Sequence, residues 1–381
     1  MPAPMQRNTV THTSIPQRNK TMGERILVGM SGGVDSSVAV NVLRSRGFSP
    51  IGMYLNMKHG NDAAPVRIAS ESDSNGNEDL LSALQCAEKN GVELYKMGCE
   101  EIFRKCVIKY FTEEYLAGRT PNPCTVCNRT VKFERLLAAA DMLGCKKVAT
   151  GHYARIAADE VTGRFYVKKG LDPRKDQSYM LWKLSQAQLS RLVFPLGDHV
   201  KTDVFKTAEK EGYIAADRDE SLDICFLPDG VSYPEFIEER FGKCPEGYFI
   251  SPDGEVCGRH KGIIHYTVGQ RKGLGVALGE PVFILRIDKE TNRIYLGKKS
   301  DEGTDTFTAD GINFMKLSSS ESFAGEFDVK IRYAASPVKA HVSFENGILT
   351  VTTAEKVRAV TPGQSLVAYD GDDVMFGAVI R

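Results

Sequence analysis

Three cysteines stand in settings that suit sulfur or metal chemistry. Cys124 and Cys127 form a C-x-x-C pair within TPNPCTVCN (120–128), a stretch in which two prolines predict a stiff, non-helical loop. Such a pair can be half of a zinc site, a redox pair or two ligands of an iron–sulfur cluster. A second C-x-x-C is absent from the sequence, which disfavours structural zinc. Cys225, taken alone in SLDICFL (221–227), is predicted to be a buried strand cysteine.

A second chemical feature is the glycine-rich stretch SGGVDS (31–36), here called the SGGVDS loop. An apolar run at 26–30 precedes it and predicts a buried strand, and a helical pattern follows it. Free N–H groups and the dipole at a helix start attract an anion, and the glycines allow close approach. The loop is not a Walker A loop, because no Lys follows the glycines and Asp35 stands there instead. A strand–helix turn without a ligand is the alternative.

The elements that must position these residues alternate between strand and helix in the first part of the chain. We predict strands at 51–55, 92–97 and 146–150 and helices at 78–90, 101–116 and 131–143, with a loop at 58–77. This alternation predicts an α/β fold with a doubly wound parallel sheet. Ligands of such sheets lie at the carboxyl ends of the strands, where Ser31 and the pair Gly151-His152 are both expected.

The second part of the chain reads differently. Residues 153–226 are mixed, with helices expected at 179–192 and 206–211, and glycine is dense from 228 to 279. Five short strands, expected at 327–333, 340–344, 348–353, 365–369 and 374–380, predict a small β-barrel. We therefore expect a disordered tail at 1–23, an α/β domain at 24–226, a small central domain at 227–281 and a barrel at 282–381.

The composition sets wider bounds. Lys+Arg and Asp+Glu are both 49, so the net charge is zero and gives no global argument for nucleic acid. No apolar run approaches the ~20 residues of a membrane span. The odd number of cysteines, nine, and the lack of a secretory signal indicate a reducing compartment, and we expect the cytoplasm. The polar, acid-free tail leaves a mitochondrial or plastid matrix as an alternative.

Six motifs occur in one order and carry a resemblance. They are SGGVDS (31–36), TPNPCTVCN (120–128), ATGHYAR (149–155), KDQSY (175–179), DICF (223–226) and HYTVGQRKGLG (265–275). The first resembles the PP-loop of the N-type ATP pyrophosphatases, which cleave ATP between the α- and β-phosphates. Together, from about residue 24 to the C-terminus, the six resemble the tRNA-specific 2-thiouridylases.

The resemblance implies a reaction on the wobble uridine of tRNAs for Lys, Glu and Gln. ATP, with Mg²⁺, adenylates the C2 oxygen and releases pyrophosphate, and a cysteine persulfide then delivers sulfur and releases AMP. It implies two partners, the anticodon stem-loop of tRNA and a sulfur-donor protein or relay, while the oligomeric state stays open, with a monomer expected. By position, Cys225 matches the persulfide carrier and Cys127 the partner nucleophile, which forms a disulfide with it.

The resemblance also assigns binding positions. Those for ATP are Gly29, Met30, Ser31, Gly32, Gly33, Val34, Asp35, Ser36, Leu55 and Gly151. Those for tRNA are Asn122, Pro123, Cys124, His152, Lys175, Asp176, Gln177, Arg332, Tyr333 and Gln364, the first three of them near the target base.

One position departs from the family pattern. Many members carry Asp where this chain has Cys124, and that Asp has been given an acid/base role, so the role is filled differently here or is dispensable. Cys124, Cys127 and Cys225 could instead hold a [4Fe–4S] cluster with one open iron that replaces the persulfide route.

Two basic clusters fit a tRNA substrate. They are Arg164, Lys168, Lys169, Arg174 and Lys175, and Arg259, Lys261, Arg271 and Lys272. Either the side chains of these clusters contact the tRNA phosphate backbone, or each cluster lies on a solvated loop. Two other functions stay open at this point: another PP-loop adenylating synthetase, and a non-catalytic zinc or RNA-binding module.

Overall fold

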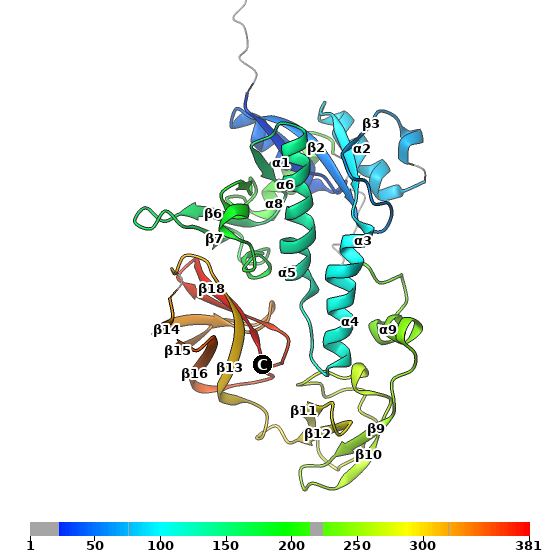
Figure 1. The fold of residues 1–381 in the computed structure, drawn as a ribbon, viewed down its shortest axis with the longest axis vertical. Helices are drawn as coiled ribbons and strands as arrows, with labels where there is room; N and C mark the ends of the chain where they lie inside the picture. The colour runs from blue at the N-terminus through cyan, green and yellow to red at the C-terminus, as the bar shows by residue number, and fades with distance from the viewer. Residues whose placement is uncertain (1–22, 75, 214–223, 319) are drawn as a thin grey trace, which may run out of the picture.

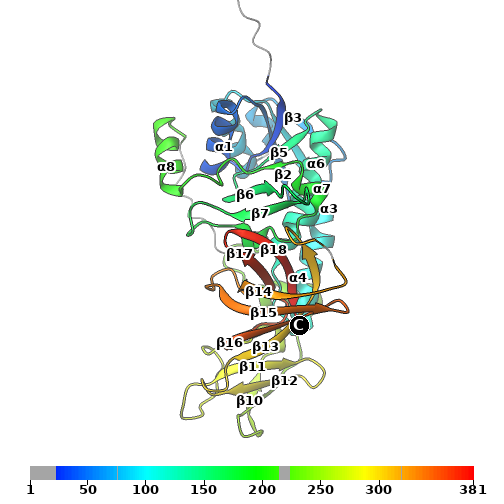
Figure 2. The ribbon, with the colours of Figure 1, turned by 90° about the vertical axis from the view of Figure 1, so that its left-hand side faces the viewer.

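The computed structural model describes residues 23–74, 76–213, 224–318 and 320–381. The expected tail, apart from residue 23, and Asp223 of the DICF motif lie outside these residues. The described chain is elongated, with an α/β domain at one end, a small sheet at the other and a β-barrel between them (Figures 1 and 2). No helix of the described part is long and apolar enough to cross a membrane.

The α/β domain contains the doubly wound sheet that the sequence predicts. Its strand order is β3-β4-β2-β1-β5-β8, and every neighbouring pair is parallel except β3 and β4. The strands are β1 (Arg25–Gly29), β2 (Ser49–Asn56), β3 (Val66–Ile68), β4 (Leu94–Gly98), β5 (Lys147–Ala149) and β8 (Leu192–Val193). The helices α1 (Val34–Ser45), α2 (Glu78–Lys89) and α8 (Lys201–Lys210) accompany this sheet. The expected loop at 58–77 is wrong in part, because it contains β3 and the 3₁₀ turn η1 (Glu71–Ser74).

Two long helices run from the α/β domain toward the rest of the molecule (Figure 1). The first joins α3 (Glu100–Phe103), the π-helical turn η2 (Arg104–Ile108) and α4 (Lys109–Leu116). The second joins α5 (Pro123–Cys127), the π-helical turn η3 (Asn128–Lys132) and α6 (Phe133–Met142). The prediction of a non-helical loop through 128 is therefore wrong. Pro123 occupies the first turn of α5, where a missing N–H costs nothing and the fixed φ suits a helix.

A β-hairpin that the sequence did not predict is inserted between β5 and β8 of the α/β sheet. Its strands are β6 (Ala154–Ala158) and β7 (Phe165–Lys169), and β7 pairs with the barrel strand β18 at Lys168 and Asp373. The helix expected at 179–192 is wrong. That stretch holds only the turn η4 (Ser178–Met180), the short helix α7 (Gln186–Leu189) and the start of β8. The helix expected at 206–211 is part of α8, which begins earlier.

The small sheet has the strand order β10-β9-β12-β11. It contains β9 (Gly247–Ile250), β10 (Val256–His260), β11 (Phe283–Asp288) and β12 (Arg293–Gly297), and it is accompanied by α9 (Tyr233–Phe241) and the turn η5 (Ile263–His265). Because β12 pairs with β9, this sheet crosses the boundary expected at 281. We propose that the central domain extends to the end of β12.

The C-terminal barrel is closed by six antiparallel strands. They are β13 (Thr304–Phe314), β14 (Ser322–Lys330), β15 (Val338–Glu345), β16 (Ile348–Val357), β17 (Ser365–Asp370) and β18 (Asp373–Ile380). Pairing of β13 with both β16 and β18 closes the ring. Alternating side chains fill the interior, among them Phe307, Val342 and Phe376. The expected barrel is confirmed, and β13 is a sixth strand that the sequence pattern did not reveal.

Candidate functional site: a nucleotide pocket beside three cysteines

A pocket of about 350 Å³ opens at the carboxyl ends of β1, β2 and β5. This volume lies in the usual range for a small-molecule site. The pocket brings together nine positions that the sequence assigned to ATP or tRNA: Gly29, Met30, Ser31, Asp35, Ser36, Leu55, Gly151, His152 and Gln177. It is also lined by Met53, Tyr54, Met57, Lys132, Leu136 and Thr150, which the sequence reasoning did not single out.

The SGGVDS loop has the geometry of an anion site. Gly33 is the N-cap of α1, and the first intrahelical bond runs from the Ser37 N–H to the Gly33 carbonyl at 3.4 Å. The N–H groups of residues 34–36 precede this bond, so the helix itself offers them no acceptor. Gly32 has φ of +83°, and a Cβ there would lie 2.6 Å from Cβ of Ser82 in α2. Only glycine satisfies both constraints at position 32.

Gly32, Gly33 and Val34 shape the loop without lining the pocket. Val34 is buried between α1 and α8, in the cluster that contains Val38 and Val204. The backbone around these residues determines the conformation of the loop, while Ser31, Asp35 and Ser36 face the cavity.

Gly151 joins the second sequence motif to the first. A Cβ at this position would lie 3.0 Å from Cβ of Asp35 and 3.1 Å from its carbonyl carbon. The end of β5 therefore touches the start of α1, which is possible because residue 151 has no side chain.

Asp35 is held by a cation from a distant part of the chain. The Lys201 ammonium donates to both Asp35 carboxylate oxygens, at 2.8 and 2.7 Å, and the Tyr153 hydroxyl donates to Oδ1 at 2.7 Å. The Lys201 side chain is buried, and its Nζ lies 4.9 Å from the ring centroid of Phe205. Its own N–H donates to the buried Asp172 carboxylate, which fixes the start of α8.

Lys201 is a residue that the sequence reasoning missed. The SGGVDS loop carries no Lys of its own, and the structure brings one to its edge from α8. The signal in the sequence is slight, because Lys201 is separated from Asp35 by 166 positions.

His152 forms part of the pocket wall in a neutral state. Its Nδ1 lies 2.7 Å from the Thr150 hydroxyl, and its ring packs against the rings of Phe133 and Phe194, with centroid distances of 5.7 and 5.5 Å. Burial lowers the pKa of His152 well below its usual value, and the charge of Lys132 acts in the same direction. A neutral imidazole can donate or accept one hydrogen bond to a nucleotide without adding charge.

Lys132 lies between the pocket and the cysteines. It ends the π-helical turn η3, five residues after Cys127, and it lines the nucleotide pocket. Its ammonium lowers the thiol pKa values of Cys124 and Cys127, against the larger raising effect of burial. π-Helical turns occur often at functional sites, because the extra residue redirects side chains.

The three cysteines come together at the start of the second long helix. Desolvation by the surrounding protein raises the pKa of Cys127 to about 11 and also raises the pKa of Cys124, although Cys124 presents part of its surface to solvent, and the charge of a Cys225 thiolate raises both further. Cys225 stands on a turn in which the Leu227 N–H donates to the Ile224 carbonyl at 3.0 Å. The prediction of a buried strand cysteine is wrong, because Cys225 is exposed.

Phe226 anchors this turn against the helices. Its ring makes edge or tilted contacts with Phe103, Phe111 and Phe236 at centroid distances of 5.7, 5.2 and 5.6 Å. These contacts hold the turn of Cys225 against the first long helix, and Phe226 packs on the same cluster of Cys99, Phe103, Val107 and Val131 as Cys127 of α5.

The thiols of the described residues do not form a metal-binding group. Within residues 23–74, 76–213, 224–318 and 320–381, no group of three or more His, Cys, Asp or Glu side chains is placed to hold a metal ion. Cys124, Cys127 and Cys225 are near one another without forming such a group, so we derive no chemical step through a cluster.

Comparison with known proteins gives the same domain order. Residues 24–229 match the tRNA methyl transferase HUP domain, residues 234–298 the tRNA methyl transferase PRC-barrel domain, and residues 304–380 the Aminomethyltransferase beta-barrel domain. The tRNA-specific 2-thiouridylase MnmA of Acetivibrio thermocellus is 41% identical over 360 residues, covering 94% of this chain and 99% of that protein.

Two further relatives carry the same name. That of Heliobacterium modesticaldum is 42% identical and covers 94% of this chain and 93% of its own length. That of Clostridioides difficile is 38% identical and covers 94% and 99%. The chain belongs to the tRNA-specific 2-thiouridylase family. The resemblance drawn from the six motifs is thereby confirmed.

The 2-thiouridylase motif TPNPCTVCN is held by the barrel. The Gln364 side-chain amide donates to the carbonyls of Thr120 and Pro121 at 3.0 and 3.3 Å, and the Thr120 N–H donates to the Pro362 carbonyl. Asn122 is buried beside Met180, and Pro123 follows it at the start of α5. In this 2-thiouridylase, Gln364 therefore positions the cysteine-bearing segment, whereas the sequence assigned it to tRNA.

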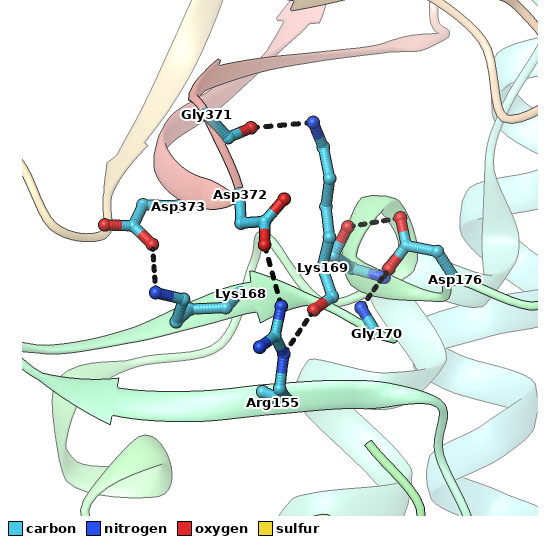
Figure 3. A network of polar contacts seen from close by, with 9 residues as sticks. Arg155, Lys168, Lys169, Gly170, Asp176, Gly371, Asp372 and Asp373 are labelled. Atoms are coloured by element: carbon cyan, nitrogen blue, oxygen red, sulfur yellow. Dashed lines mark hydrogen bonds and ion pairs between the residues drawn. The ribbon is translucent and has the colours of Figure 1, made fainter. Parts of the chain in front are cut away.

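The KDQSY motif also makes internal contacts. The Asp176 carboxylate accepts the N–H group of Gly170 at 2.9 Å (Figure 3). It also accepts the N–H group of Ser178 at 3.1 Å and the Ser178 hydroxyl at 2.8 Å. Gln177 exchanges two hydrogen bonds of 2.9 Å with the backbone of Tyr153 and reaches the nucleotide pocket. Both side chains fix the loop that carries Lys175.

The remaining positions assigned to tRNA lie at the end of β14. Arg332 donates to the Arg358 carbonyl, and Tyr333 is 38% exposed although it is aromatic. The Lys330 ammonium lies 5.4 Å from the centroid of the Tyr333 ring. An exposed ring beside two cations suits the stacking of an unpaired base.

Proposed function

We propose that this chain catalyses ATP-dependent 2-thiolation of the wobble uridine of tRNA. The observation that carries the proposal is the nucleotide pocket of an SGGVDS loop beside three cysteines, in a chain of the 2-thiouridylase family. Adenylation and sulfur transfer both act at C2 of one base, so a single protein needs both features at one place.

ATP is the first substrate in this proposal. The backbone N–H groups at the start of α1 bind the phosphates, and Ser31 and Ser36 face them from the loop. The Lys201 ammonium provides the positive charge that a Walker A Lys provides elsewhere, and it withdraws from Asp35 toward the pyrophosphate. Attack by the uridine C2 oxygen on the α-phosphorus breaks the bond to the bridging oxygen, and pyrophosphate leaves.

Mg²⁺ would bind beside Asp35. Among the described residues that line the pocket, Asp35 has the one carboxylate, and hard oxygen ligands of this kind suit the ion. Bound there, Mg²⁺ would offset the charge of the departing pyrophosphate.

Sulfur then comes from the cysteine side of the pocket. A persulfide on Cys225 is the sulfur carrier, and a second thiol frees its outer sulfur. The family pattern gives the second role to Cys127. Sulfur adds to C2 of the adenylated base, AMP leaves with the electron pair of the C2–O bond, and a sulfur-donor protein reloads Cys225.

The tRNA would lie across the face formed by α5, the KDQSY loop and β14. Lys175, Arg332 and Tyr333 are the proposed contacts to the anticodon stem-loop, because the family pattern assigns them to tRNA and Tyr333 presents an exposed ring. Phosphate contacts by Lys and Arg would make the affinity fall with salt.

Pyrophosphate release tests this function against its alternatives. The protein, incubated with ATP and unmodified tRNA, should release pyrophosphate only when the tRNA is present. A synthetase that acts on a small molecule would not require tRNA, and an RNA-binding module would release none. Either result would reject the proposal, and a tRNA with cytidine at the wobble position is the matched control substrate.

A further inference from the structure

Lys183 and Arg129 are two neighbouring cations that do not line the nucleotide pocket and have no part in the reaction described so far. Lys183 lies in the turn between η4 and α7, and Arg129 belongs to the π-helical turn η3. Arg129 donates a side-chain hydrogen bond to the carbonyl of Lys183, so the two residues are in direct contact. Both residues are half-buried. Their position and their partners therefore need an explanation.

The turn that carries Lys183 is fixed beside the TPNPCTVCN segment. From the barrel, the Asn313 side-chain amide donates to the two carbonyls that flank Lys183, at 2.6 and 3.1 Å. From the second long helix, the Asn128 side-chain amide donates to the carbonyl of Met180 at 3.0 Å. The side-chain nitrogen of Asn122 lies 3.6 Å from the sulfur of the same Met180. These contacts hold Lys183 close to the segment that the family pattern places near the target base.

The Lys183 ammonium lies against aromatic rings. Its Nζ is 5.6 Å from the ring centroid of Tyr110 in α4 and 5.1 Å from that of Trp182, which are distances of cation–π contacts. Burial lowers the pKa of Lys183 to about 8, against the raising effect of the Glu114 carboxylate, and the charge of Arg129 lowers it further. Lys183 is therefore a partly desolvated cation that is repelled by its neighbour.

Among the described residues, no carboxylate forms an ion pair with Lys183 or Arg129. Glu114 is the one acid that acts on the pKa of Lys183, and it already accepts two hydrogen bonds from Arg119. Two like charges that are partly removed from water cost free energy unless an anion joins them. The pair therefore fits an anion that the protein binds from outside.

We propose that Lys183 and Arg129 bind a phosphate of the tRNA backbone next to the wobble base. The inference rests on the proposed function and adds a binding site to it. A base that reaches the segment of Asn122 brings its flanking phosphates to the neighbouring turn. The Arg129 guanidinium has N–H groups beyond the one that it donates to Lys183, and together with the ammonium these can surround a phosphate. The rings of Tyr110 and Trp182 keep the ammonium in position before the RNA arrives.

A cycle of protein and RNA substitutions tests this site. The affinity of the full-length protein for an unmodified anticodon stem-loop RNA is measured by fluorescence anisotropy at several salt concentrations. The wild type is compared with Lys183→Met, Lys183→Arg and Arg129→Met. A series of stem-loops carries one uncharged methylphosphonate linkage, placed at each loop phosphate in turn. Lys109→Met is the matched control, because Lys109 is exposed on α4 and pairs with Glu113 at 3.8 Å.

We expect Lys183→Met and Arg129→Met each to weaken binding by about tenfold and to reduce the slope of log affinity against log salt by about one. Lys183→Arg should keep most of the affinity, and Lys109→Met should keep all of it. A methylphosphonate beside the wobble position should weaken binding to the wild type by a similar factor and have little effect on Lys183→Met. The Tm of Lys183→Met should not fall, because a partly buried charge is removed.

An unchanged affinity and slope in Lys183→Met would overturn the proposal, as would a wild type that does not bind the stem-loop. Methylphosphonate effects that are equal in the wild type and in Lys183→Met at every position would overturn it too. A weaker affinity with an unchanged slope and a lower Tm would show that Lys183 only supports the fold. Failure of the proposed function looks different: if the cycle gives the expected result but tRNA never triggers pyrophosphate release, the phosphate site stands and the assigned reaction is wrong.

Discussion

At the scale of single residues, the nucleotide pocket depends on the ion pair between Asp35 and Lys201. Asp35 belongs to a motif that is visible in the sequence, while Lys201 reaches it from the first turn of α8. The pair is mostly buried, with side-chain exposures of 30% and 8% for Asp35 and Lys201. A pair in this setting can exchange its partner for a phosphate, because the ammonium stays desolvated in both states.

Replacing Lys201 tests its role toward the pyrophosphate. In Lys201→Met we expect the KM for ATP to rise by about tenfold or more, because a charge-assisted contact worth roughly 1.5–3 kcal/mol is lost. The measurement is the rate of tRNA-dependent pyrophosphate release against ATP concentration, with thermal unfolding as a check of the fold.

Lys206→Met is the matched control on the same helix, since Lys206 is exposed and pairs only with Asp203 among the described residues. An unchanged KM in Lys201→Met, with a lower Tm, would mean that Lys201 only stabilises the loop.

The sequence could reveal the pocket at this scale only where the signal is local. The SGGVDS loop and Gly151 are short motifs at strand ends, and the sequence alone predicts the position of both. Lys132 and Lys201 could not be found in this way, because their relevance comes from the turn η3 and from the position of α8. The exposure of Cys225 cannot be predicted from local sequence either, since Phe226 and not Cys225 packs its side chain against the helices.

At the scale of elements, the start of α5 decides where the cysteines point. The two prolines of TPNPC suggest a loop, but only residues 119–122 are non-helical, and Pro123 begins the helix. The residue type alone does not tell whether a proline begins a helix or interrupts one. That outcome depends on the contacts that fix the preceding loop. Those contacts come from Gln364 and Pro362 of the barrel.

A substitution at Asp176 tests whether hydrogen bonds inside the protein position the KDQSY loop. Asp176→Asn keeps an oxygen for the two N–H groups but loses a charged acceptor of the Ser178 hydroxyl, so the free energy of unfolding should fall by about 1 kcal/mol. The affinity for tRNA should fall while its dependence on salt is unchanged, because no phosphate contact is removed.

Lys175→Ala is the comparison for that variant. It should weaken tRNA binding and reduce the slope of log affinity against log salt by about one. A reduced slope in Asp176→Asn together with an unchanged free energy of unfolding would contradict the positioning role.

At the scale of the whole molecule, the hairpin β6–β7 joins the α/β domain to the barrel. Arg155 pairs with Asp372 at 2.8 Å, Lys168 with Asp373 at 2.9 Å, and the Lys169 ammonium donates to the Gly371 carbonyl at 2.7 Å (Figure 3). Asp373 also pairs with Lys316 at 2.7 Å. Lys168 and Lys169 belong to a basic cluster that the sequence offered for tRNA, and the structure uses both of them between domains.

The pH dependence of stability tests this junction. Burial acts to raise the pKa of Asp373, but the ammonium groups of Lys316 and Lys168 outweigh it, and the folded pKa lies below the usual value. The carboxylate therefore stabilises the fold above its unfolded pKa, and this contribution is lost as the pH falls through the folded pKa.

Asp373→Asn should accordingly have a lower Tm than the wild type by a constant amount from pH 7 to about 5, with the difference shrinking below about pH 4. Thermal unfolding across this range measures it, and Asp370→Asn, in an exposed position of the same turn, is the control. A difference that stays constant down to pH 3 would show that the charge of Asp373 is not used.

Much of the architecture follows from periodicity alone. The alternating strands and helices gave the doubly wound sheet, and the five β-branched segments gave the barrel. The hairpin β6–β7 and the strand β13 could not be predicted, because their side chains are only partly buried and their pattern is set by partners in other domains. The central sheet combines strands on both sides of a glycine-rich stretch, so composition alone does not indicate that these strands belong together.

The most direct test of the account separates adenylation from sulfur transfer in the variant Cys225→Ser. Given ATP, tRNA and a persulfide donor, this variant should release pyrophosphate in amounts up to the tRNA present and should form no 2-thiouridine, as measured by mass spectrometry of the digested tRNA. Normal amounts of 2-thiouridine in Cys225→Ser, or pyrophosphate release that continues without tRNA, would contradict the account.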